Sequence, residues 1–343
     1  MKRAGHLVIA VGRRIAIVAL LFFLFLPVAA RAQTDPLPSW NDGAPKRAII
    51  DLVARVTKEG GPDFVPVPER IATFDNDGTL WCEQPFYVQM AFAFDRVKEM
   101  APQHPEWKTK QPFKALLKGD VKTAATAGEK GLLAVIAATH SGMTVTQFDQ
   151  EVRDWIKVAR HPRFKRPYNE LIYQPMLEVL NYLRANGFKT FIVSGGGIDF
   201  MRPWAPAAYG IPPEQIVGSV GVAQFRFGKD GTPELFKTPK VQFIDDGPGK
   251  PVGIYMNIGR QPIIAFGNSD GDLQMLQYTT GGSGARLGLY VHHDDAEREY
   301  AYDRKSQIGR LDKGLDQAKA RGWPVISMKR DWKVIFPAQQ ASR

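Results

Sequence analysis

The stretch "IATFDNDGTLW", residues 71–81, decides the fold, because an apolar run stops there at two carboxylates. Residues 70–74, "RIATF", have the length and composition of a buried strand. Asp75 and Asp77 follow it with one residue between them. Two carboxylates this close repel each other unless a cation or a shared proton separates them. The stretch therefore predicts a buried strand that leads into a functional loop.

The pattern on either side of this strand is that of an α/β protein. Apolar residues at helical spacing predict a helix over 47–59, before the strand. Further along, the chain alternates between predicted helices and short apolar strands: helices over 175–187, 199–209 and 249–259, strands over 188–197, near 216, over 262–266 and 285–295, and a hairpin around 229–231. Such alternation is typical of a parallel sheet covered on both faces. We expect a Rossmann-like, doubly wound parallel sheet.

Residues 83–170 interrupt this alternation and contain no convincing strand. Apolar side chains recur at helical spacing from Phe148 to Ala159, and Thr146 is placed to cap that helix. We therefore expect an all-helical cap over 83–170, inserted between two parts of one core, 33–82 and 171–343.

The first 32 residues have the composition of a signal peptide. Basic residues precede the apolar run 15–30, and Ala30-Arg31-Ala32 supplies small residues at the usual cleavage spacing. The run is shorter than a bilayer span and contains Pro27, which disfavours a retained membrane anchor. We expect cleavage before Gln33 and a periplasmic or secreted protein.

Charge and cysteine content limit the possible partners. Removal of the leader lowers the formal net charge from +10 to +5, and no basic tract with interleaved aromatics marks a nucleic-acid path. We therefore expect no nucleic-acid partner and no stable membrane insertion after cleavage. Cys82 is the single cysteine, so no intramolecular disulfide forms, and we expect it to be a small buried apolar residue.

Three predicted strands end in loops of unusual chemistry, and ligands of such sheets bind beyond the carboxyl ends of the strands. "TFDNDGT" and "AFGNSDGD" are acidic, and hard oxygen ligands of this kind suit Mg²⁺. "IVSGGG" offers the Ser194 hydroxyl and bare backbone amides, and "GPGKP" offers the Lys250 ammonium group. Metal, lysine and amide donors around one point make a site for a phosphoryl group.

These four motifs together resemble the haloacid dehalogenase superfamily of phosphohydrolases, and more closely its phosphoserine-phosphatase-like branch. "DNDGT", "IVSGGG", "GKP" and "GNSDGDLQM" occur in the family's order over roughly residues 70–295. The resemblance implies that Asp75 is the nucleophile and that Asp77 is the general acid and then the general base. It implies that Thr79 steadies the loop, and that Ser194, Gly195 and Lys250 bind the phosphate. Mg²⁺ would be held by Asp75, the Asp77 carbonyl and the acidic loop.

The acidic loop departs from the family pattern, which commonly reads G-D-x-x-x-D. Asn268 stands where the first carboxylate is expected, and Asp272 stands on the second. An amide oxygen still ligates Mg²⁺ but brings no charge. We expect Asp272 to be needed and Asn268 to be the direct ligand, with Asp270 as its substitute.

The predicted function is that of an exported, Mg²⁺-dependent phosphomonoesterase that hydrolyses small phosphorylated metabolites through a phosphoaspartate on Asp75. A phosphotransferase of the same fold and a catalytically silent ligand-binding module are the alternatives. Halide removal from a haloacid is disfavoured, because dehalogenases of the superfamily need no carboxylate at the position of Asp77. The sequence identifies neither the substrate nor the oligomeric state.

Three other polar stretches could belong to a site or to the surface. Glu83 and Gln84 either touch the leaving group or form a surface pair. His292 and His293 are adjacent on a strand, so they point to opposite faces and make strand-end polar contacts more readily than a metal site. The charged run 297–305 is expected to be exposed.

Overall fold

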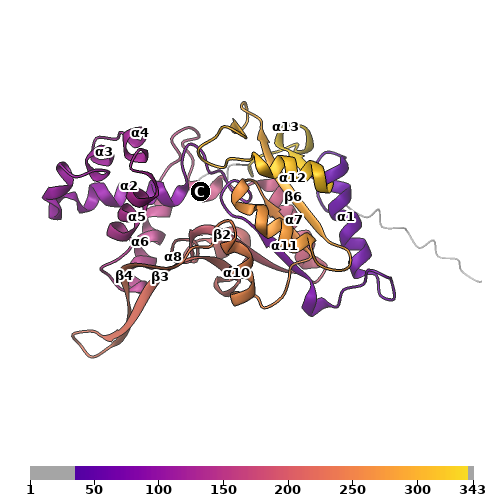
Figure 1. Cartoon of the computed structure of the whole chain (residues 1–343), viewed down its shortest axis with the longest axis horizontal. Coiled ribbons are helices and arrows are strands. Elements are labelled where there is room, and N and C mark those ends of the chain that lie inside the picture. The colour runs from indigo at the N-terminus through magenta and orange to yellow at the C-terminus, as the bar shows by residue number, and fades with distance from the viewer. Residues whose placement is uncertain (1–34, 339–343) are drawn as a thin grey trace, which may run out of the picture. The chain divides into compact units, whose positions relative to one another are not determined.

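The computed structural model describes residues 35–338, and residues 36–338 belong to one compact unit (Figure 1). The predicted signal peptide, residues 1–32, lies outside the described residues. No helix in the described range is both long and apolar enough to cross a membrane.

The centre of the unit is an eight-stranded sheet in the order β4-β3-β2-β1-β5-β6-β7, with β8 beside β6. β1 is parallel to both β2 and β5, and the remaining pairs are parallel except β3 with β4 and β6 with β7. The strands are β1 (Ile71–Phe74), β2 (Lys189–Gly197), β3 (Ile216–Phe227), β4 (Pro233–Phe243), β5 (Ile264–Gly267), β6 (Leu287–Asp294), β7 (Ala301–Tyr302) and β8 (Val325–Ser327).

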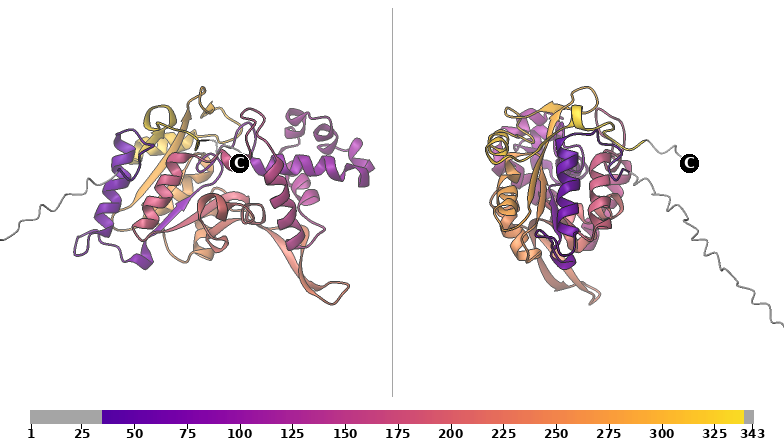
Figure 2. Two further views of the ribbon diagram at one scale, coloured as in Figure 1. Left: turned by 180° about the vertical axis from the view of Figure 1, so that it is seen from behind. Right: turned by 90° about the vertical axis from the view of Figure 1, so that its right-hand side faces the viewer.

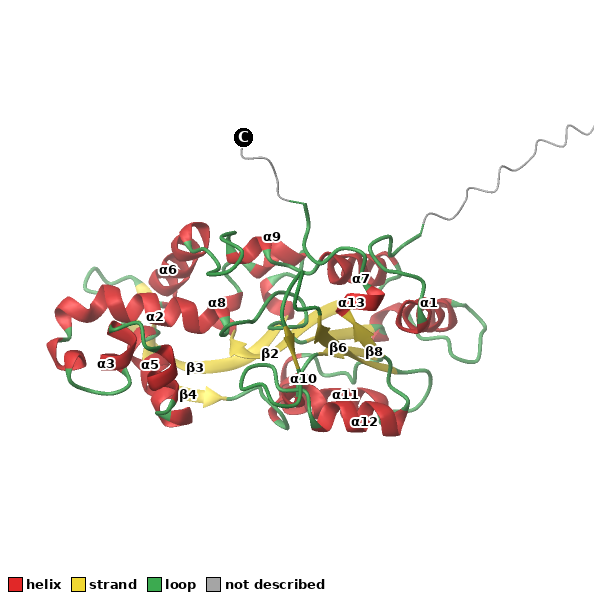
Figure 3. Ribbon diagram, turned by 90° about the horizontal axis from the view of Figure 1, so that it is seen from above, coloured by secondary structure: helices red, strands yellow, loops and turns green. Residues whose placement is uncertain are grey.

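Helices cover both faces of this sheet. The helices around it are α1 (Ala44–Thr57), α7 (Gln174–Ala185), α8 (Ile198–Met201), α9 (Ala205–Tyr209), α10 (Gly249–Asn257), α11 (Leu273–Thr280), α12 (Lys313–Arg321) and α13 (Met328–Asp331). α1 and α7 lie on one face, and α10, α11 and α12 lie on the other (Figure 2 and Figure 3). The predicted α/β class with a doubly wound, mainly parallel sheet is confirmed.

The apolar stripes read from the sequence are the surfaces that bury these helices. Ile49, Val53 and Val56 of α1 are buried in the core, as are Met176 and Leu180 of α7. Burial of each such side chain stabilises the fold by roughly 1.5–3 kcal/mol. Because strand β1 is buried along its whole length between two parallel neighbours, it reads as a continuous apolar run.

The chain between β1 and β2 forms a group of helices that we call the helical insert, residues 83–170. Its α-helices are α2 (Val88–Met100), α3 (Phe113–Leu117), α4 (Val121–Ala125), α5 (Gly128–Thr139) and α6 (Val145–Val158). The insert lies at one end of the sheet, beside the β3–β4 hairpin (Figure 1). Thr144, and not Thr146, caps α6, because its hydroxyl and the Gln147 side chain form a reciprocal capping box.

Backbone contacts join the two segments through which the chain leaves the core and returns to it. The amide of Cys82 donates to the carbonyl of Leu171 at 3.0 Å, and the amide of Tyr173 donates to the carbonyl of Leu80 at 2.9 Å. A bridge between Trp81 and Ile172 lies between these two bonds. We call this arrangement the clasp, since it holds both ends of the helical insert at one point.

The remaining differences from the sequence expectations have local causes. The helix expected over 199–209 is divided into α8 and α9, because Pro203 and Pro206 lack the N–H that a continuous helix needs. The short strand expected near Ile216 continues to Phe227 and forms a long hairpin with β4. α11, β7, α12, β8 and α13 were not predicted.

Candidate active site

Strand β1 delivers both carboxylates of the first motif to the carboxyl edge of the sheet. The amide of Asp75 donates to the carbonyl of Phe266 at 2.9 Å, which continues the ladder between β1 and β5. The indole N–H of Trp81 donates to Oδ1 of Asp77 at 2.8 Å. Gly78 makes the turn with a φ of +76°, and a Cβ there would lie 2.0 Å from the Asn268 amide nitrogen. The turn therefore requires glycine.

Lys250, at the start of α10, joins the first motif to the acidic loop. Its Nζ donates to Oδ1 of Asp75 at 2.6 Å and to Oδ1 of Asp272 at 2.5 Å. A third bond, of 2.9 Å, goes to the carbonyl of Val193 in β2. The ammonium group is buried, so these bonds replace the water it has lost. All four motifs thus meet at one nitrogen atom.

The two first-motif carboxylates hold their protons more strongly than free aspartates. Burial raises the pKa of Asp75 well above its usual range, and Asp272 raises it further, while Lys250 opposes both. Burial also raises the pKa of Asp77 to about 6, against the hydrogen bond from Trp81. A carboxyl group with a pKa near 6 can both give and take a proton near neutral pH, as a general acid and base must.

The serine and glycines at the end of β2 lie at the same place. The Ser194 hydroxyl accepts a hydrogen bond from the amide of Gly196 at 3.1 Å, and Ser194 and Gly195 line one cavity together with Asp75, Asp77 and Lys250. The structure therefore brings these five predicted site residues together. It places Thr79 behind them.

Thr79 is fully buried and braces the acidic loop. Its hydroxyl donates to Oδ1 of Asn268 at 3.1 Å, and it does not line the cavity. This contact matches the loop-steadying role that the resemblance implied. Because Thr79 does not line the cavity, its position does not support a direct contact with phosphate.

The acidic loop uses its carboxylates in different ways. Oδ2 of Asp272 accepts from the amides of Asn268 and Ser269 at 2.9 and 3.0 Å, which folds the loop around it. Oδ1 of Asp270 accepts from the amides of Asp312 and Gly314 at 3.0 and 2.8 Å. Asp270 is thus engaged through Oδ1 with the start of α12, and Asn268 is engaged through Oδ1 with the Thr79 hydroxyl.

The oxygen donors at this edge fit a hard divalent cation. Asp75, Asp77 and Asp272 share one lysine, which leaves an excess of negative charge, and Asn268 adds an amide oxygen. Within residues 35–338, no three histidine, cysteine or acidic side chains already converge as the ligands of a metal. The donor chemistry, and not a preformed coordination shell, is what fits Mg²⁺ here.

Glu83 is a site residue whose placement the sequence left open. It is only 1% exposed, so it is not part of a surface pair. Its Oε1 accepts from the side-chain Nδ2 of Asn268 at 2.7 Å and from the hydroxyl of Tyr302 at 2.8 Å, and it lines the cavity. Burial raises the pKa of Glu83 well above its usual range, and Asp77 and Asp75 add to this, against the Tyr302 bond. The Glu83 carboxyl group thus lies beside the side chain of Asn268, which stands where the family pattern has a carboxylate.

Asp245 was also missed. Its side chain is fully buried, and neither of its oxygens has a hydrogen-bond partner within the described residues. Burial raises its pKa to about 7, although the charge of Lys250 opposes this. Nothing in the local sequence pattern distinguishes this carboxylate from its exposed neighbour Asp246.

A separate buried cluster contains the other candidates. Nδ1 of His293 lies 3.1 Å from Oε2 of Glu299, its Nε2 lies 2.8 Å from the carbonyl of Gly78, and the Cys82 thiol donates to Glu299 at 3.0 Å. The predictions of polar contacts for His293 and of a buried Cys82 are confirmed. The expectation that 297–305 is exposed is wrong for Glu299, which is fully buried.

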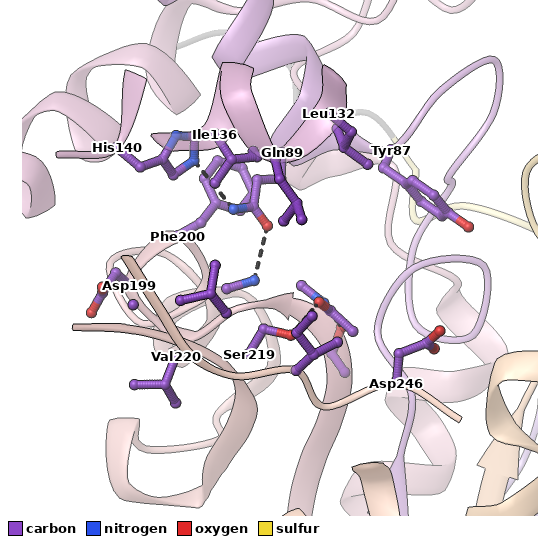
Figure 4. Close-up of a pocket in the computed structure, with 18 of the residues that line it drawn as sticks. Tyr87, Gln89, Leu132, Ile136, His140, Asp199, Phe200, Ser219, Val220 and Asp246 are labelled. Carbon is purple, nitrogen blue, oxygen red and sulfur yellow. Dashed lines mark hydrogen bonds between the residues drawn. The ribbon is translucent and has the colours of Figure 1, made fainter. Parts of the chain in front are cut away.

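The cavity beyond the carboxylates has a volume of about 570 Å³. Figure 4 shows it between two walls, with Gln89, Ile136 and His140 of the helical insert on one side and Ser219 and Val220 of β3 on the other. The reactive groups Asp75, Asp77, Ser194 and Lys250 line this same space. A ligand held there would extend between the insert and the hairpin.

Comparison with known proteins identifies relatives of the chain. A family model described as haloacid dehalogenase-like hydrolase matches residues 72–277. No curated protein matches the sequence. A functionally unknown protein from Anaerococcus prevotii is 16% identical with a TM-score of 0.53, over 87% of this chain and 96% of that one. It shares the fold.

Two further solved structures are more distant in shape. A protein of unknown function from Bordetella pertussis is 16% identical with a TM-score of 0.46, over 75% of this chain and 98% of that one. A phosphoserine phosphohydrolase-like protein from Francisella tularensis is 16% identical with a TM-score of 0.36, over 65% and 88%.

Proposed function

The chain belongs to the haloacid dehalogenase-like hydrolase family, and from that premise we propose that it is a Mg²⁺-dependent phosphomonoesterase with Asp75 as the nucleophile. The observation that carries the proposal is that Asp75, Asp77, Ser194 and Lys250 line a single cavity. Two carboxylates, a hydroxyl and an ammonium group at one point suit the transfer of a phosphoryl group.

In the first step, a carboxylate oxygen of Asp75 attacks the phosphorus of the ester. Oδ1 is held by Lys250, and within the described residues no hydrogen bond engages Oδ2. As the O–P bond to Asp75 forms, the bond from phosphorus to the alcohol oxygen breaks, and Asp77 gives its proton to that oxygen. The products of this step are the free alcohol and an aspartyl phosphate.

In the second step, water attacks the same phosphorus atom. Asp77, now ionised, accepts a proton from the water, and the bond between phosphorus and the Asp75 oxygen breaks. Inorganic phosphate leaves, and both aspartates return to their starting states. Lys250 remains in place to offset the charge of the phosphoryl oxygens, and the Ser194 hydroxyl can donate a hydrogen bond to them.

Asp75, the backbone carbonyl of Asp77, Asn268 and Asp272 would hold the Mg²⁺. When bound, the ion offsets the negative charge of the phosphoryl group and of the crowded carboxylates. The proposal includes export to the periplasm or to the outside of the cell, because residues 1–32 have the composition of a signal peptide.

The test is phosphate release by residues 33–343 from a panel of monoesters, with Mg²⁺ or with chelator. Activity that depends on both the metal and Asp75 is the expected result. Absence of phosphate release from every ester would contradict the proposal. Adding an excess of a second alcohol separates hydrolysis from phosphotransfer, because a transferase makes a new ester in place of free phosphate.

A further inference from the structure

Several large apolar side chains of this protein are exposed to solvent and gather in one place. Leu132 and Leu133 are 40% and 36% exposed, and Val241 and Ile244 are 49% and 46% exposed. All four line the cavity that contains Asp75. Contiguous exposed apolar surface that leads to a reactive centre is typical of a ligand site.

These side chains come from opposite walls. Leu132 and Leu133 belong to α5 of the helical insert, while Val241 lies near the end of β4 and Ile244 directly after it. Figure 4 shows Leu132 and Ile136 on the insert side of the cavity and Val220 across from them. A ligand between the walls would cover apolar surface on both sides.

The polar side chains deep in these walls are already paired with one another. Nε2 of Gln89 lies 3.2 Å from Nε2 of His140, and its Oε1 accepts from the amide of Gly197 at 2.9 Å. Burial lowers the pKa of His140 to about 3, so its ring is neutral near pH 7. The ammonium group of Lys237 is hydrogen-bonded to the carboxylate of Asp199. None of these groups requires a polar partner from the ligand.

The size of the space agrees with this chemistry. A cavity of about 570 Å³ holds far more than a phosphate group and falls in the range of sites for drug-sized ligands. The other charged wall residues, Lys240 and Asp246, are exposed to solvent.

We propose that the preferred substrates are phosphate monoesters of bulky apolar alcohols, whose apolar part lies between α5 and the end of β4. This inference rests on the proposed phosphatase function and narrows its substrate class. A small polar ester such as phosphoserine would leave most of the apolar wall uncovered. Lys237 and Asp199 are already paired with each other, so neither is free to bind the carboxyl or amino group of phosphoserine.

The first test compares kcat/KM for ethyl phosphate, hexyl phosphate and phosphoserine in Mg²⁺ buffer. Ethanol and hexanol are leaving groups of nearly equal acidity, so the two alkyl esters differ mainly in apolar contact. Each buried methylene is worth about a factor of four. We expect hexyl phosphate to exceed ethyl phosphate at least ~10-fold, below the limit of ~200-fold for four fully buried methylenes. Equal values, or a preference for phosphoserine, would overturn the inference.

The second test locates the preference on the wall. The double variant Val241→Ser/Ile244→Ser changes only exposed positions, and we expect it to lower the hexyl-to-ethyl ratio at least ~5-fold. The matched control is Val67→Ser/Val334→Ser, at 54% and 41% exposed positions that do not line the cavity. The control should leave the ratio unchanged. An equal fall in both double variants would contradict the assigned wall.

Failure of the catalytic proposal would be recognised separately by calorimetry on Asp75→Asn with ethyl and hexyl phosphate. If no ester is hydrolysed but hexyl phosphate still binds at least ~10-fold more tightly, the apolar pocket stands and the reaction does not. Equal affinities for the two esters would overturn the pocket itself, whatever the enzyme hydrolyses.

Discussion

Asp75 and Glu299 are both buried carboxylates, but their surroundings differ. Glu299 accepts hydrogen bonds from the Cys82 thiol, the Tyr173 hydroxyl and the Tyr300 amide, and it faces His293. Within residues 35–338, Asp75 has Lys250 as its one hydrogen-bonded cation and is crowded by Asp77 and Asp272.

The pKa shifts record this difference. Burial alone would raise the pKa of Glu299, but His293 and the hydrogen bonds lower it below its usual range. The pKa of Asp75 is raised by burial and by like charge. A fully bonded carboxylate stabilises the fold, whereas a crowded one is held in place by the fold and is available for chemistry. The following experiments test this distinction.

Replacing the crowded carboxylate should abolish activity and spare the fold. Asp75→Asn removes the nucleophile, so we expect kcat for phosphate release to fall roughly 10⁴-fold or more. The amide is isosteric and relieves the repulsion with Asp272, so the melting temperature should not fall. Steady-state phosphate release and thermal melts of the same preparation measure both. Activity within tenfold of the wild type would remove Asp75 from its proposed role.

Replacing the bonded carboxylate should have the opposite outcome. Glu299→Ala leaves His293, Cys82 and Tyr173 without their acceptor, and we expect a loss of about 3 kcal/mol in the free energy of unfolding at pH 7. Because the pKa of Glu299 is lowered by folding, its contribution is present above pH 4.5 and disappears as the pH falls. Urea unfolding at pH 7 and pH 4 measures it. A loss below 1 kcal/mol at pH 7 would contradict the assignment, and Glu299→Gln serves as the milder control.

The pH dependence of the reaction should report Asp77. With a pKa of about 6, Asp77 loses its proton above that pH, so kcat/KM for an alkyl ester should fall about tenfold per pH unit between pH 7 and 9. A nitrophenyl ester, whose leaving group needs less protonation, should show a flatter profile. Asp77→Asn is the control for ionisation of the substrate itself and should lack the falling limb. A flat alkyl profile in the wild type would contradict the role of Asp77 as general acid.

Asp245 extends the comparison to a buried carboxylate without partners. Its folded-state pKa of about 7 lies above the unfolded value of 3.8, so the native state binds the extra proton and stability falls as the pH rises from 4 to 7. Asp245→Asn cannot ionise, and we expect it to be more stable than the wild type by ~1–2 kcal/mol at pH 8 and about equal at pH 4. Urea unfolding at both pH values measures this. A variant less stable at pH 8 would show that ionised Asp245 has a stabilising role.

Much of the fold could be predicted from local sequence patterns. β1, β2, β5 and β6 are short apolar runs, and α7 has a regular apolar stripe, so each could be predicted from its own residues. β7 and β8 are two and three residues long and exist only through pairing with β6, which no local pattern reports. The sequence prediction placed the cap of α6 at Thr146, although Thr144 and Gln147 have the spacing of a capping box.

The site divides in the same way. Asp75 and Asp77 follow a predicted strand, Ser194 lies near the end of another, and Lys250 begins a predicted helix, so topology alone brings them to one edge. Glu83 becomes a site residue through its hydrogen bonds to Asn268 and Tyr302, which lie 185 and 219 positions away along the chain. The shape of the apolar wall depends on how the insert lies against the hairpin. Such long-range contacts leave no periodic signal in the sequence.

The clasp has a consequence for how this protein could change over evolution or in the laboratory. Because the chain leaves the core at Cys82 and returns at Leu171 with those two backbones already hydrogen-bonded, the helical insert is attached at what amounts to a single socket. A different helical module with neighbouring ends could be grafted there without disturbing the strands that carry Asp75 and Lys250. The α5 wall of the cavity is therefore encoded apart from the strands that carry Asp75 and Lys250, and that wall can be varied while those strands are kept.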